Sequence, residues 1–87
     1  MARIECTPAE SVLWQDKYSD GYRTARGDIT WNQPPRVELI EIPPERPFET
    51  GAEYVARHVR LAWMIGYAAA WRWEYGRRAA AAELVTV

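Results

Sequence analysis

The chain has one cysteine, one histidine and five scattered glycines among its 87 residues, and each scarcity excludes a class of chemistry. Cys6 alone cannot form an internal disulfide framework. His58 has no second histidine or cysteine at metal-ligand spacing, and it would have to serve any histidine-dependent catalytic arrangement by itself. No glycine-rich phosphate-binding loop is present. We therefore predict that the protein is not an enzyme and that it has no catalytic residue, metal site or cofactor.

The chain also lacks a large charge excess and a long hydrophobic run. Its net charge is −1, which is not the charge of a protein that coats nucleic acid. The longest apolar run, Leu61 to Trp71, is about half as long as a bilayer span, and Arg60 and Arg72 close its two ends. No signal-peptide pattern opens the sequence. These features predict a cytoplasmic protein without a membrane span.

Aromatic residues, by contrast, are abundant, with five Trp, five Tyr and one Phe. A chain of this length folds as one domain with a modest core, and large aromatic side chains help such a core to bury enough surface. We therefore predict a single domain over residues 1–87.

The clearest element runs from Thr50 to about Val85 and is predicted to be one long helix. Thr50 and Glu53 have the spacing of a capping box, and Phe48 is placed to take part in a hydrophobic staple. Good helix formers fill the interior. If the helix breaks, Gly76 is the expected position, because the four alanines that follow could restart a short helix.

The first 49 residues predict short strands, one helix and turns. The predicted elements are, in chain order, a strand at 2–6, a helix from 8 to about 18, a turn at 19–21, a hairpin over 22–31, a strand at 36–42 and a proline-rich connector at 43–47. Together with the long helix they indicate an α+β fold. In this fold a small antiparallel sheet carries a short N-terminal helix, and the long C-terminal helix packs across it.

The long helix has two distinguishable faces when its residues are placed at about 100° intervals. One face is rich in small residues, is assigned to the core and consists mainly of Val55, Val59, Ala62, Gly66, Ala69, Ala70 and Trp73. The opposite face, which we call the aromatic–arginine stripe, consists of Arg57, Arg60, Met64, Tyr67, Trp71, Tyr75 and Arg78. Tyr, Trp, Met and Arg are enriched at protein interfaces, because they bury a large area with little loss of side-chain freedom.

Three interpretations of the aromatic–arginine stripe remain open. It can be core packed under the N-terminal segments, the self-contact of a homodimer, or the binding site for another macromolecule. In the third case Tyr67, Trp71 and Arg78 are expected to dominate the contact, supported by Met64 and Arg60. Interleaved arginines and aromatic rings also suit single-stranded nucleic acid or RNA, although the acidic N-terminal half opposes its approach.

We favour a non-enzymatic protein-binding module that acts on a protein complex of unknown identity. Small, cysteine-poor single domains of this type are common among phage-encoded inhibitors of host defence, including anti-CRISPR proteins, which act in the host cytoplasm. This is an argument from class and not from a motif. The first alternative is a homodimeric structural or accessory protein, and the second is a nucleic-acid binder.

Overall fold

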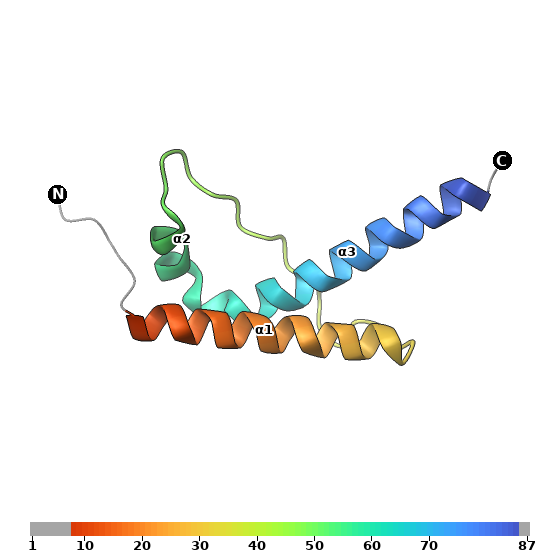
Figure 1. Cartoon of the computed structure of the whole chain (residues 1–87), viewed down its shortest axis with the longest axis horizontal. Helices are drawn as coiled ribbons and strands as arrows, with labels where there is room; N and C mark the ends of the chain where they lie inside the picture. Colours follow the sequence, from red (N-terminus) through yellow and green to blue (C-terminus); the bar gives the residue numbers. More distant parts are fainter. Residues whose placement is uncertain (1–7, 86–87) are drawn as a thin grey trace.

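The computed structural model describes residues 8–85 and shows a helical hairpin (Figure 1). The first arm is α1 (Pro8–Thr30), and the second arm contains α2 (Gly51–His58), the 3-10 helix η1 (Val59–Leu61) and α3 (Ala62–Val85). The described residues are about 74% helical and contain no strand. The predicted α+β fold with a small sheet is therefore wrong. The strand predicted at 2–6, including Cys6, lies outside the described residues.

Helix α1 continues through the turn predicted at 19–21 and the hairpin predicted over 22–31. Gly21 suggested a turn from the sequence because glycine is a poor helix former. In the structure Gly21 is buried inside the helix, where it faces α3. Tertiary packing thus outweighs the local preference, as it does for most helices in folded proteins.

The end of α1 is fixed by backbone hydrogen bonds beyond Thr30. Asn32 adopts a left-handed conformation with φ of 55°, and its N–H donates to the carbonyl of Ile29. The N–H of Gln33 donates to the carbonyl of Asp28. This is the arrangement of a Schellman motif, in which a left-handed residue lets the last carbonyls of a helix find donors.

The two arms of the hairpin cross at two glycines that touch the opposite backbone. A Cβ atom on Gly21 would overlap the carbonyl oxygen of Trp63, and a Cβ atom on Gly66 would overlap the carbonyl oxygen of Tyr18. The prediction that the small-residue face of the long helix permits a close approach is correct at Gly66. The partner that approaches is α1 and not a sheet.

The predicted strand at 36–42 is part of an extended linker between the arms, and it has no partner strand. Five of the six prolines of the chain lie between residues 31 and 50, and proline cannot donate to a strand ladder. Val37 and Leu39 instead pack against the core cluster that contains Tyr67 and Trp71. The alternating apolar residues thus cover a helix instead of joining a sheet.

The second arm begins as predicted and breaks elsewhere than predicted. The hydroxyl of Thr50 accepts a hydrogen bond from the N–H of Glu53, which confirms the N-cap. Phe48 is fully exposed, so it forms no hydrophobic staple. The helix is interrupted by η1 and passes through Gly76 without a break. Gly76 is exposed with open space around it, so no neighbouring element bends the helix there.

The buried centre of the hairpin consists of small residues and two large aromatic rings. Its members are Ala25, Tyr67, Ala70 and Trp71, with Tyr22, Ile29, Val37, Leu39 and Trp63 packed around them. Beyond the crossing, α3 leaves α1 and projects from the body, which measures 56 × 27 × 18 Å (Figure 1). No helix among residues 8–85 is long and apolar enough to span a membrane, as the short apolar run indicated.

Candidate functional site

The structure divides the aromatic–arginine stripe into a buried middle and two exposed ends. Tyr67 and Trp71 are 0% and 1% exposed, and Met64 is half-buried. The linker supplies part of this cover, since Val37 and Leu39 pack against the cluster that contains both rings. The middle of the stripe therefore corresponds to the interpretation as core, and it offers almost no surface to a partner.

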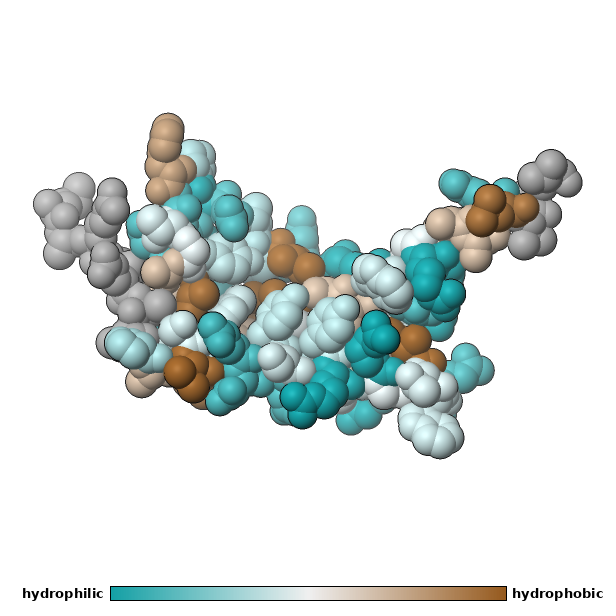
Figure 2. All heavy atoms as spheres, viewed as in Figure 1, coloured by the Kyte–Doolittle hydropathy of each residue, from teal (hydrophilic) through white to brown (hydrophobic). Residues whose placement is uncertain are grey.

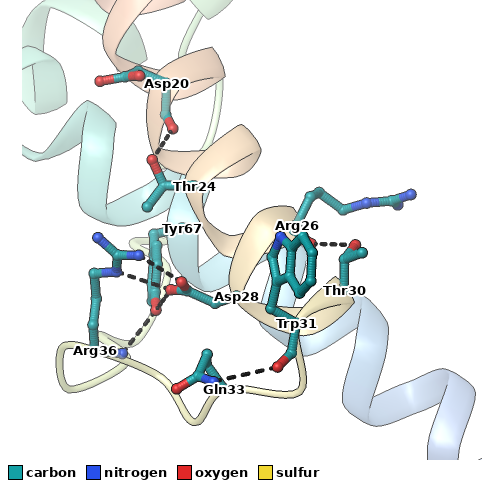
Figure 3. A network of polar contacts seen from close by, with 9 residues as sticks. All are labelled: Asp20, Thr24, Arg26, Asp28, Thr30, Trp31, Gln33, Arg36 and Tyr67. Atoms are coloured by element: carbon teal, nitrogen blue, oxygen red, sulfur yellow. Dashed lines mark hydrogen bonds and ion pairs between the residues drawn. The ribbon is translucent and has the colours of Figure 1, made fainter.

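A polar network fixes the linker over the middle of the stripe (Figure 3). The Tyr67 hydroxyl donates to Oδ2 of Asp28 at 2.8 Å and accepts from the backbone N–H of Arg36 at 2.8 Å. The Arg36 guanidinium also binds both oxygens of Asp28, with 2.9 Å between Nε and Oδ2. These hydrogen bonds to Arg36 lower the pKa of Asp28 against the opposing effect of burial. The network joins α1, the linker and α3 through one carboxylate.

The C-terminal end of the stripe, Tyr75 and Arg78, remains exposed on α3. Tyr75 is 45% exposed, and the Arg78 guanidinium lies over the rings of both Trp71 and Tyr75, 5.7 and 6.0 Å from their centres. Arg78 also donates to Glu74, which is buried and binds Arg77 through two further hydrogen bonds. The bonds from Arg77 and Arg78 lower the pKa of Glu74 to about 2.

Two exposed indoles lie near this end, and the sequence analysis did not assign either to a binding site. Trp73 had been assigned to the core face, but it is 55% exposed, and the guanidinium of Arg26 on α1 lies 5.6 Å from its ring centre. Trp31 follows α1 directly and is 79% exposed. The exposure of Trp73 could not be read from periodicity, because it depends on where α1 ends.

Arginines gather at this end of the hairpin, which we call the basic end. Within residues 21–36 and 68–80 the arginines are Arg23, Arg26, Arg36, Arg72, Arg77 and Arg78. The acidic residues of the same two ranges are Asp28 and Glu74, and both are buried. Their carboxylates hold guanidinium groups that are about half exposed to solvent. The surface of the basic end is therefore positively charged.

The N-terminal end of the stripe, Arg57 and Arg60, has a different environment. Arg57 donates two hydrogen bonds to the buried carboxylate of Glu49, at 2.6 and 2.8 Å, and Glu49 also accepts from the backbone N–H of Arg46. These bonds lower the pKa of Glu49 to about 2, with Arg57 as the main cause. Arg60 is exposed on η1. Arg57 is thus committed to holding the loop that precedes α2.

That loop presents Phe48 to solvent in an unfavourable conformation. The N–H of Glu49 donates to the carbonyl of Arg46, which closes a turn with Pro47 and Phe48 at its centre. Phe48 has φ of 62° and is 103% exposed. A left-handed conformation is rare for a bulky residue. We call residues 46–49 the Phe48 turn, and the sequence analysis missed it because Phe48 precedes a helix cap.

The described residues support no catalytic or metal chemistry. They contain no group of three His, Cys, Asp or Glu side chains that could hold a metal ion. The Nε2 atom of His58 is buried without a hydrogen-bond partner, and burial is the main cause of its lowered pKa. The ring of Tyr54 packs on His58, with 4.7 Å between the ring centres. This environment is that of a packed histidine at the junction of α2 and η1.

Comparisons with known proteins identify no relative of this chain. No family model matches the sequence, no curated protein matches it, and no solved structure matches the fold.

Proposed function

We propose that the protein is a non-enzymatic protein-binding module and that its contact surface is the exposed part of α3 at the basic end. The observation that supports this most is the pairing of half-exposed aromatic rings with fixed guanidinium groups. Trp73 and Tyr75 are 55% and 45% exposed, and arginines lie over both rings. Aromatic and arginine side chains of this kind form the energetic centres of many protein interfaces.

The rigidity of these side chains favours a binding role. Arg77 and Arg78 are held by the buried carboxylate of Glu74, and Arg26 is held over the Trp73 ring. Ordering a flexible side chain on binding costs about 0.5–1.5 kcal/mol, and here part of that ordering precedes binding. A helix that projects from its domain can also enter a groove on a partner.

The proposal retains Tyr75 and Arg78 from the aromatic–arginine stripe and adds Trp73 and Arg77. A nucleic-acid ligand is disfavoured by the acidic linker, which carries Glu38, Glu41, Glu45 and Glu49. The narrower hypothesis of a phage-type inhibitor, similar in action to anti-CRISPR proteins, requires the captured partner to belong to a host defence complex.

A nuclease-treated affinity pull-down from bacterial lysate tests the proposal. The parent is compared with a Tyr75→Ala/Arg78→Ala variant and with a Val12→Ala/Leu13→Ala control, whose apolar residues are similarly exposed on α1. Circular dichroism checks that all three are helical. We expect a stoichiometric protein band with the parent and the control that the α3 variant loses. A band that all three retain would contradict the assigned surface, and a band that nuclease removes would contradict a protein partner.

A further inference from the structure

The two ends of the elongated molecule carry opposite charge. Residues 41–56 contain four glutamates and one arginine, and they include the Phe48 turn. The basic end contains six arginines, and its two carboxylates are buried. In Figure 1 the loop before α2 and the projecting end of α3 lie at opposite ends of the long axis. A patch of one sign therefore cannot reach the other within one molecule.

Each end also exposes large apolar side chains. The acidic end presents Phe48, which is 103% exposed, and the tip of this loop is brown in Figure 2. The basic end presents Trp31 and Trp73. Exposed aromatic groups of this size mark contact sites more often than they occur on inert surfaces. One end therefore offers a single projecting ring, and the other offers two indoles with cations beside them.

The Phe48 turn is held rigidly although its conformation is unfavourable. Glu49 accepts from the N–H of Arg46 and from the guanidinium of Arg57, so both ends of the turn are fixed to one carboxylate. Phe48 itself gains no burial within the chain. A strained residue that the surrounding structure maintains and that contributes nothing to the core suggests a function.

We propose that the Phe48 turn of one molecule docks on the basic end of a second copy of this chain. The ring of Phe48 packs between Trp31 and Trp73, and the glutamates beside the turn face Arg26 and Arg77. The two contact surfaces differ, so the contact is heterologous, and each added molecule leaves one end of each kind free. Such a contact extends into open chains instead of closing as a symmetric dimer.

The proposed contact is small and electrostatic, which sets the conditions for observing it. A few aromatic rings and rim charges bury less than the roughly 800 Å² per partner of a standard interface, so we expect weak association, with a dissociation constant on the order of 10–100 µM. Exposed charges attract each other less as salt is added. The inference rests on the proposed function only in taking the basic end as a contact surface.

Sedimentation velocity over about 10 to 500 µM protein, in about 20 mM and about 500 mM salt, tests the inference. We expect the average mass to rise with concentration beyond that of a dimer at low salt and to return toward a monomer at high salt. Phe48→Gly removes the docking ring and relieves the unfavourable φ, so this variant remains folded. Arg26→Glu/Trp31→Ala changes the other end, and Leu84→Ala is a control at an exposed apolar residue outside both contacts.

The mixing experiment distinguishes a heterologous contact from a symmetric one. Each variant alone should be monomeric, and an equimolar mixture should form 1:1 dimers and nothing larger, because each molecule keeps one intact end. A parent that stays monomeric at low salt, assembly that survives Phe48→Gly, or a mixture that remains monomeric would overturn the inference. If the parent stays monomeric and the pull-down still depends on Tyr75 and Arg78, the proposed function survives without it.

Discussion

Three buried carboxylates, Asp28, Glu49 and Glu74, organise most of the charged side chains that the structure holds in place. Each accepts two hydrogen bonds from the guanidinium of one arginine. Because each carboxylate is buried and its arginine is more exposed, the pairs place positive charge on the surface and negative charge beneath it. Removing one partner of such a pair leaves the other unpaired, which costs more than the pair contributes.

We predict that acid destabilises the hairpin through these carboxylates. The pKa values of Glu49 and Glu74 are about 2 in the folded protein, below the ordinary value of 4.5. Their contribution to the free energy of unfolding is therefore fully present above about pH 4.5 and is lost as the pH falls toward 2. Asp28 acts in the same direction. Urea denaturation at a series of pH values should show the midpoint falling over this range.

The matched variants Glu49→Gln and Glu74→Gln test the source of this pH dependence. Each should be less stable than the parent at pH 7 and should lose less stability on acidification, because one titrating group is gone. A parent whose urea midpoint is the same at pH 5 and pH 2.5 would contradict the ion pairs.

At the scale of elements, the linker determines what the helices expose. The alternating pattern at 36–42 is correct for an extended segment, but pairing it into a sheet requires a partner strand, and the segment at 22–31 is helical. Local signals such as the Thr50 cap were predictable because cap and partner lie three residues apart. The burial of Tyr67 and Trp71 was not, because it depends on the linker crossing the far side of α3.

Gly66 and Gly76 provide a matched pair for testing the crossing. Gly66→Ala should destabilise the protein by about 1–3 kcal/mol, because the new Cβ would overlap the Tyr18 carbonyl and the arms must separate. Gly76→Ala should stabilise it by up to about 1 kcal/mol, because nothing lies within 4 Å and alanine favours a helix. Thermal or urea unfolding measures both. Equal effects of the two substitutions would contradict the close contact of α1 with α3.

At the scale of the whole molecule, the hairpin is an elongated body with a buried aromatic centre and two different ends. Its Cα radius of gyration is 15.7 Å, larger than the roughly 12 Å of a compact chain of this length. The long helix therefore does project, as its length indicated, although the expected bend at Gly76 is absent. The surface available to partners is concentrated at the basic end and at the Phe48 turn.

Hydroxyl-radical footprinting of the individual tryptophans, read by mass spectrometry, tests most directly that the binding surface is the basic end and not the middle of the stripe. In the free monomer at high salt, Trp31 and Trp73 should be oxidised rapidly, and Trp71, 1% exposed, should be protected. In the complex recovered by pull-down, Trp73 should become protected while Trp71 stays unchanged. Oxidation of Trp71 as fast as Trp31 in the free protein would contradict the account, because the linker would then not cover the stripe.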